Sequence, residues 1–470
     1  MSVDALQGLP KDERRRAMRL GNLQGALWAV GNGLTTGPFM IYLALELNAT
    51  NQDIGLILAM PAFVGLLRLF APRLFRALGG LKPGAVVCLT ASYALLCLLP
   101  VISVAIQSSM VPARGWMVAF VAVLCVHQLL ESIGLVAVWS WLGEIVPQRI
   151  RGRYFAARQR WQIWALVPTL LFAAMTADYV HDRYSLAMRT AVAAWAYIGP
   201  VAIGTVFLLA SVVPLIYMRA TSALEGPGSK SNPAGSRERS SLVGPDMTMA
   251  FARLVLVGCW LSFFNGLTQT AQNRYPRDVL KLDVLPLAIM RMVMQIGQIA
   301  LAPVVGRAAD RYGNRPVLVL CQAVVSVGLL FYWMATPEQP YWLAGAWIAW
   351  SAFVGLNVCL PNLMLKLSPR HDSSKYVATY FAITGLTYGA GTLFGSGLLD
   401  TLAVRFPYPV LGIPLNHYGY LFYIGWVTRA LGAVLLLSLI EPGAWGILEV
   451  LRGRRKAQAT TGVQPQSPWD

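Results

Sequence analysis

Long apolar runs dominate the pattern of hydrophobic and polar positions along the chain. A helix that crosses a bilayer needs about 20 mostly apolar residues, and twelve runs approach or exceed that length. They lie at residues 20–43, 53–70, 84–106, 116–142, 160–177, 191–218, 250–272, 284–304, 316–335, 341–363, 376–399 and 416–439. The pattern predicts an all-α polytopic membrane protein with 12 transmembrane helices.

The twelve runs form two groups of six, and the groups share short motifs. Asn32–Thr35 in the first run reads Asn-Gly-Leu-Thr, as does Asn265–Thr268 in the seventh. Further along, Gly79–Pro83 is matched by Gly313–Pro316 at nearly the same offset. Motifs that recur in the same order indicate a duplicated six-helix unit. Parallel six-span repeats are typical of transporters that hold a substrate near the midplane between the repeats.

Composition and charge exclude a soluble enzyme and orient the spans. Of the 470 residues, 56% are hydrophobic and 13% are charged, and the mean hydropathy is +0.55. A soluble domain has about twice that charged share. With the N-terminus inside, cytoplasmic segments hold 29 of the 38 Lys and Arg residues and outer loops hold seven. Basic residues mark the cytoplasmic side, so both termini are predicted to be cytoplasmic. The net charge of +17 therefore reflects topology, and no nucleic-acid partner is expected.

The same features predict the organisation of the chain. The stretch from Arg219 to Met247 is charged and rich in Pro, Gly and Ser, which is typical of a flexible linker. We expect an N-terminal tail at 1–18, a six-helix bundle at 19–218, a linker at 219–248, a second bundle at 249–440 and a C-terminal tail at 441–470. The protein is predicted to be a monomer in the inner or plasma membrane of the cell. The six cysteines lack metal-ligand spacing, so no disulfide, metal or cofactor is expected.

The loop after the eighth run contains glycines, an acid and arginines at short intervals. It reads Gly306-Arg-Ala-Ala-Asp310-Arg311-Tyr-Gly313-Asn-Arg315-Pro. This loop resembles the signature loop of the major facilitator superfamily, and with the two six-span halves the resemblance covers about residues 19–440. It implies that spans 1, 4, 7 and 10 line a central cavity. It also implies a contact between the halves that closes the cytoplasmic side.

A second loop, between the fourth and fifth runs, is similar to the E-x-x-P-x-x-x-R-G loop of sugar porters and other facilitators. The predicted cytoplasmic gate therefore comprises Gly306, Asp310, Arg311, Gly313, Arg315, Glu144 and Arg151. The first-half counterpart of the signature loop, residues 71–83, has no Asp, which leaves one of the two symmetric gate contacts without its acid. The alternative is that these charges only anchor the topology.

Ionisable side chains within the spans are functional candidates, because each costs a few kcal/mol at the bilayer centre. Glu131 and His127 are four residues apart on one face of the fourth span and are predicted to be the proton-coupling site. Arg291 in the eighth span is predicted to hold an anionic or polar part of the substrate. Alternatively, Glu131 only pairs with a neighbour and Arg291 extends to the outer surface.

Polar and aromatic side chains form stripes on the same helices and complete the predicted substrate site. Its members are Arg291, Gln295, Gln298, Asn265, Gln269, Gln272, Asn32, Trp350, Asn357 and Tyr380. Amides also bond helix to helix, so the stripes have a structural alternative. Arg429 in the twelfth span is expected to be structural, because the resemblance implies a peripheral helix there, and the sequence names no partner for it.

These observations favour a secondary active transporter that works by alternating access. We expect a small organic anion as substrate and protons as the coupled partner, within the lipid bilayer. The alternatives are an exporter of amphiphilic compounds, a sugar or polyol porter, and a non-transporting membrane sensor or scaffold. No Walker A or H-E-x-x-H sequence is present, so neither ATP-driven pumping nor an intramembrane enzyme is expected.

Overall fold

A computed structural model describes residues 11–67, 74–75, 77–107, 113–146, 151–185, 191–218, 248–367, 373–405, 416–441 and 443–452. Across these residues the chain is helical and contains no strand. The first half comprises α1 (Lys11–Thr35), α2 (Pro38–Glu46), α3 (Asn51–Leu67), α5 (Leu81–Leu96), α6 (Leu98–Gln107), α7 (Ala113–Ile145), α8 (Arg151–Ser185) and α9 (Ala191–Tyr217). The predicted linker lies outside the described residues except for Thr248.

The second half repeats this helical pattern. It comprises α10 (Met249–Leu267), α11 (Gln269–Asp278), α12 (Val284–Tyr312), α13 (Asn314–Met334), α14 (Trp342–Ala349), the short helix η4 (Trp350–Ala352), α15 (Phe353–Leu367), α16 (Ser373–Arg405), α17 (His417–Leu435), η5 (Leu436–Ser438) and α18 (Ile447–Arg452). Each predicted apolar run coincides with one of the helices or with consecutive ones. In the described part of the chain, nine segments are long and apolar enough to span a membrane. The full set of 12 spans therefore stays a prediction.

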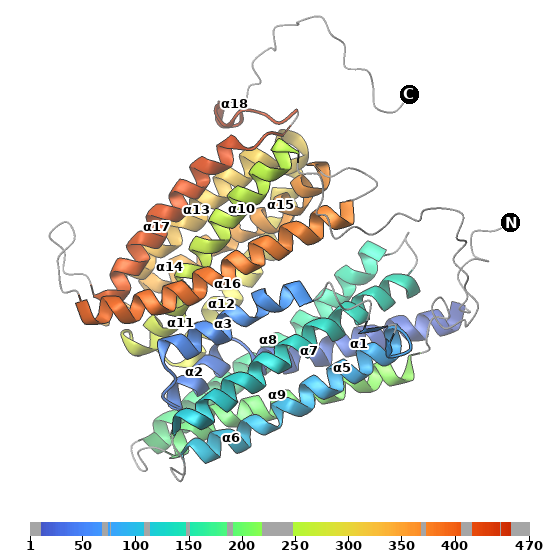
Figure 1. The fold of residues 1–470 in the computed structure, drawn as a ribbon, viewed down its shortest axis with the longest axis vertical. Helices are drawn as coiled ribbons and strands as arrows, with labels where there is room; N and C mark the ends of the chain where they lie inside the picture. Colours follow the sequence, from blue (N-terminus) through green and yellow to red (C-terminus); the bar gives the residue numbers. More distant parts are fainter. Residues whose placement is uncertain are drawn as a thin grey trace, which may run out of the picture.

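The helices pack in two groups that lie side by side (Figure 1). α1–α9 pack mainly against one another, as do α10–α17. The groups meet most extensively where α3 packs on α16 and α8 packs on α12. This arrangement places the polar faces of α1, α10 and α12 between the groups.

Several predicted runs are not continuous helices. The first is interrupted between α1 and α2, where Gly37 has a φ of 68° and is followed by Pro38. The seventh is interrupted at Thr268, between α10 and α11. The tenth contains the tighter turn η4. A positive φ favours glycine, and proline readily occupies the first position of a helix. A hydropathy profile averages over many residues and therefore does not show such a break.

Both copies of the Asn-Gly-Leu-Thr motif end at one of these breaks. The first copy ends α1, and the second ends α10. In each half a glycine of the last helix contacts the motif threonine: Gly204 in α9 contacts Thr35, and Gly425 in α17 contacts Thr268. A Cβ at either glycine would collide with the threonine side chain. The sequence repeat therefore corresponds to a repeated packing arrangement around a helix break.

Hydrogen bonds between the two groups gather at the end that the topology prediction places outside. Arg277 of α11 pairs with Glu46 of α2 and donates to the carbonyl of Tyr42 over 2.9 Å. Asp178 of α8 accepts from the backbone amides of Val284 and Leu285 over 3.1 and 2.9 Å, which caps the start of α12. These contacts hold the halves together at that end.

A second set of contacts joins α3 to the other half at the same end. Asn51 donates to Asp400 over 2.5 Å and accepts from Arg274 over 2.7 Å. Ser396 donates to Gln52 over 3.3 Å. The contacts between the halves at this end therefore involve α3 and α16 as well as α2, α8, α11 and α12.

Ordered structure extends into both segments that were predicted to be tails. α1 starts at Lys11, and Ala17 is buried in the core of the first group. At the other end Glu441 is buried against α13. Both segments are more polar than the spans they extend, so the hydropathy pattern ends too early at each.

Candidate functional site

A cavity of about 530 Å³ lies between the two groups of helices. Two further cavities adjoin it, of about 600 and 240 Å³. Arg291 and Gln298 line both the first and the second, while Asn265, Asn357 and Arg429 line both the first and the third. This space is in the range that binds small organic molecules.

All ten residues of the predicted substrate site line these cavities. The first is lined by Arg291, Gln298, Asn265, Gln269, Gln272, Trp350 and Asn357. The second adds Asn32 and Gln295, and the third adds Tyr380. Their role in binding a substrate stays a prediction. Sequence reasoning did not identify Tyr42, Asn273 or Tyr332, which also line the first cavity.

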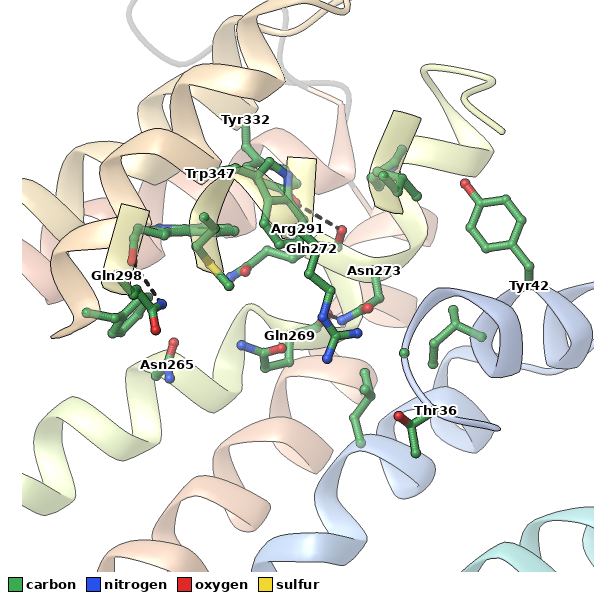
Figure 2. Close-up of a pocket in the computed structure, with 18 of the residues that line it drawn as sticks. Thr36, Tyr42, Asn265, Gln269, Gln272, Asn273, Arg291, Gln298, Tyr332 and Trp347 are labelled. Carbon is green, nitrogen blue, oxygen red and sulfur yellow. Dashed lines mark hydrogen bonds between the residues drawn. The ribbon is translucent and has the colours of Figure 1, made fainter. Parts of the chain in front are cut away.

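Arg291 extends into the first cavity from α12, toward Gln269, Asn273 and Thr36 (Figure 2). Its guanidinium lies against Gly37, where a Cβ would collide with it. Within the described part of the chain it forms no hydrogen bond or ion pair, and none of the described lining residues is acidic. A partly buried arginine at membrane depth without a counter-ion is costly, and the cavity gives it space for an anionic ligand.

Amides and aromatic rings form the wall beside this arginine. The side-chain amide of Gln272 donates to the Thr268 hydroxyl over 2.5 Å, and the backbone carbonyl of Gln272 accepts from the Tyr332 hydroxyl over 3.4 Å. The Tyr332 ring stacks on Trp350 at 5.4 Å, and Trp347 packs edge-on against Trp350 at 5.5 Å. The indole N–H groups of both tryptophans are buried and have no hydrogen-bond partner. The rings of both tryptophans border the cavity, while their N–H groups face away from solvent.

Arg429 reaches the cavity although it belongs to the last span. Its Nη2 donates to the side chains of Asn265 over 2.9 Å and Thr268 over 2.7 Å. Its Nε and Nη1 are buried without a partner. The peripheral position of the helix did not indicate that this side chain lines two of the cavities. Gly425, one turn earlier, allows the close helix contact that brings it there. The structural role expected for Arg429 stays a prediction.

Glu131 and His127 lie behind the cavity wall, inside the first half. The Glu131 carboxylate accepts from the indole of Trp28 over 3.0 Å and from Tyr93 over 3.5 Å. The second Glu131 oxygen lies 3.6 Å from His127 Nε2, while His127 Nδ1 is 2.7 Å from the hydroxyl of Ser92. Trp28 itself lines the second cavity. One side chain therefore separates the carboxylate from the cavity.

The predicted gate residues of the signature loop divide into two sets. Gly313, with a φ of 94°, ends α12 and starts α13. Arg315 then donates its backbone amide to Glu441 over 2.7 Å and its guanidinium to the carbonyl of Leu439 over 3.2 Å. This set ties α13 to the end of α17. It holds one half together rather than joining the two halves.

The other gate residues contact less. Asp310 is exposed and has no hydrogen bond or ion pair with any described residue, and Arg311 lies over the ring of Tyr312 at 5.2 Å. Gly306 has open space beside it. Glu144 and Arg151 lie in α7 and α8, but their side chains are outside the part that the structure describes. The gate role stays a prediction.

Glu441 is a structural residue that the sequence analysis did not identify. Besides Arg315, it accepts hydrogen bonds from Asn314 and Lys366, each over 2.8 Å. Burial alone would raise the pKa of Glu441, but the hydrogen bonds from Lys366, Arg315 and Asn314 outweigh it and hold the pKa below its ordinary value. The carboxylate thus stays charged where α13 and α17 meet.

Known proteins share this arrangement of helices. No curated protein matches the sequence. Three solved structures share the fold: a D-xylose-proton symporter (14% identity, TM-score 0.63, 91% of this chain and 98% of that one), the nucleoside transporter NupG (14%, 0.59, 91% and 99%) and a bacterial homologue of the iron transporter ferroportin in an inward-facing state (13%, 0.63, 90% and 98%). Identities this low speak for the fold alone. Residues 277–460 match the family model of the Major Facilitator Superfamily. Residues 277–460 therefore resemble the Major Facilitator Superfamily, and the described residues share the fold of the three solved transporters.

Proposed function

We propose that this protein moves a small organic anion across the membrane by alternating access, coupled to protons. The observation that carries the proposal is Arg291, a guanidinium that enters the central cavity with no acidic residue among its described lining. Charge interactions are strong where water is scarce, so this site favours an anion. The amides of Gln269 and Gln272 supply neutral hydrogen-bond donors for the rest of the ligand.

The proposed orientation has both termini in the cytoplasm. The contacts of Arg277, Asp178 and Asn51 between the halves then lie on the outer side, so the conformation is closed to the outside. In this orientation Asp310 is on the cytoplasmic side, where its lack of a partner among the described residues agrees with an open gate. Closing that gate would be the other half of the transport cycle.

We assign proton coupling to Glu131 with His127. Glu131 Oε2 lies 3.6 Å from His127 Nε2, so the charge of either group acts on the other. Trp28 donates to the same carboxylate and lines the cavity, so a change in cavity shape alters the environment of the carboxylate. A proton bound there links the first half to the substrate site in the second.

A neutral sugar is the second candidate, and one feature of the cavity favours it. Amides and indole rings suit hydroxyl groups, and here Gln269 and Gln272 line the same cavity as Trp347 and Trp350. A D-xylose-proton symporter shares the fold. The two candidates differ in their need for Arg291. An anion requires its positive charge, whereas a neutral sugar does not.

The test is uptake into vesicles that contain the purified protein, with an imposed pH gradient. Small carboxylates and neutral monosaccharides are compared in the wild type, in Arg291→Gln and in the matched control Arg405→Gln, which removes an exposed charge outside the cavity. We expect carboxylate uptake to fall at least tenfold in Arg291→Gln, equivalent to about 1.4 kcal/mol, and to persist in the control. Sugar uptake that is unchanged in Arg291→Gln would replace the anion proposal with the sugar one.

A further inference from the structure

The two copies of the helix break are closed by different side chains. In the second half Arg429 lies one turn after Gly425, the glycine that contacts Thr268. In the first half the residue one turn after the matching glycine, Gly204, is Leu208. Leu208 is fully buried and packs on Gly31 beside the first break. An apolar side chain therefore suffices at this place in the fold.

Arg429 also lacks the partners of a structural arginine. Its hydrogen bonds go to the neutral groups of Asn265 and Thr268, and two of its three nitrogens have no partner at all. In the described part of the chain no carboxylate pairs with it. A buried charge that is only partly satisfied destabilises the fold. The apolar counterpart in the first half shows that the fold does not require this cost.

The position of Arg429 relates it to the substrate site. It lines the first cavity together with Arg291, and it lines the third together with Asn265. In the view of Figure 2, Gln269 lies between Asn265 and the guanidinium of Arg291. The cavity wall thus carries two positive charges, and its described lining contains no acid.

We propose that the substrate is an organic dianion whose two anionic groups are separated, one held by Arg291 and the other by Arg429. The proposal rests on the proposed anion transport and specifies its substrate class. An anionic group that enters beside Asn265 accepts from the Arg429 guanidinium in place of the amide oxygen, and it provides the counter-charge that the described residues lack. Two charged contacts then select dicarboxylates over monocarboxylates of the same length.

The test compares ligands of equal length and different charge. Binding of butyrate, succinate and methyl phosphate to the full-length protein is measured at neutral pH by calorimetry. We expect the wild type to bind succinate at least tenfold more tightly than butyrate. We expect Arg429→Leu, which copies the first-half residue, to bind the two carboxylates equally while its butyrate affinity stays within about twofold of the wild type.

Two further variants separate loss of charge from loss of structure. Arg429→Lys keeps the charge and is expected to keep a preference for succinate. Thr268→Val removes a hydrogen-bond partner but leaves the arginine, and it is also expected to keep the preference. Melting without ligand shows which variants fold. If Arg429→Leu does not fold, loss of the preference in Thr268→Val would itself overturn the proposal.

Each outcome with the wild type bears on a different statement. If butyrate binds through Arg291 and succinate binds no better, the dianion proposal is wrong and the anion proposal stands. If methyl phosphate binds most tightly and depends on both arginines, they hold a single group, which also overturns the proposal of separated groups. If no anion binds, both proposals fail.

Discussion

The two halves of this protein share their helix breaks but not their buried charges. In the first half Glu131 and His127 lie behind the cavity wall and contact each other and their neighbours. In the second half Arg291 and Arg429 lie on the wall itself and lack acidic partners among the described residues. The duplicated fold supplies the cavity, and the residues that are not duplicated supply its chemistry. This difference underlies our proposal that the first half binds the proton and the second half binds the anion.

The largest effect is expected from a substitution at the proposed proton site of the first half. Glu131→Gln keeps the hydrogen bonds with Trp28 and Tyr93 available but removes the carboxylate that we propose to bind the proton. We expect uptake driven by a pH gradient to fall at least tenfold, and a factor of ten corresponds to about 1.4 kcal/mol of free energy. Exchange of substrate across the membrane should persist. Vesicle assays of accumulation and of exchange measure the two separately.

Asp53→Asn is the matched control, because it changes a buried carboxylate of the same half that pairs with Arg114 and does not touch the His127 network. It is expected to keep pH-driven accumulation. If Glu131→Gln still accumulates substrate against its gradient, the assignment of the proton to the first half is wrong.

The second prediction weakens the contact that joins the halves. Arg277→Gln removes the pairing with Glu46 and the ring contact with Tyr42. Partly exposed pairs contribute about 1 kcal/mol or less, so we expect a roughly threefold to fivefold shift toward a conformation open to the outside. Spin labels at Asn48 and Glu338, one exposed site in each half, measure the distance distribution.

The control for this shift is Arg114→Gln. Arg114 pairs with Asp53 over 2.6 Å near the same end, but both residues belong to the first half. Removing it should leave the distance distribution unchanged. An equal shift in both variants would mean that outer charge in general, and not closure between the halves, sets the conformation.

The smallest effect concerns Glu441, an acid that follows α17 and η5 in the second half. There Glu441 binds the start of α13, whereas in the first half Lys82 at the start of α5 donates to the carbonyls of Ile216 and Met218 over 2.9 and 2.7 Å. Glu441→Gln is expected to lower the melting temperature at neutral pH by roughly 2–4 °C.

The pH dependence follows from the lowered pKa of Glu441. A depressed folded-state pKa stabilises the fold above the ordinary pKa of Glu, and this contribution is lost as the pH falls through the lowered value. The difference between Glu441→Gln and the wild type should therefore disappear in acid. Lys82→Met should show a difference that does not change over the same range. A Glu441→Gln difference independent of pH would contradict the charged state of this residue.

The sequence predicts those features that depend on periodicity. The apolar runs gave the helices, and the spacing of Gln269 and Gln272, and of Arg291, Gln295 and Gln298, correctly places each set on a cavity wall. Helical periodicity fixes the face on which a residue lies. It does not require knowledge of the neighbouring helix.

Features that depend on distant packing were not predictable in this way. The reach of Arg429 to Thr268 requires the close approach of α17 at Gly425, and the burial of Glu441 requires the start of α13. The break at Gly37 needs backbone angles that a hydropathy profile does not contain. In each case the contacting segments are far apart in the sequence, so no local pattern indicates the contact.

The partners of Arg429 have a consequence for the biogenesis of the protein. An arginine near the centre of a span opposes insertion by roughly 2.5–3.5 kcal/mol. Asn265 and Thr268 precede Arg429 by 164 and 161 residues, so α10 is synthesised long before α17 leaves the ribosome. When the last span reaches the translocon, hydrogen-bond acceptors for its arginine are therefore already in the membrane. Insertion of the final helix then coincides with its docking on the first helix of its own half.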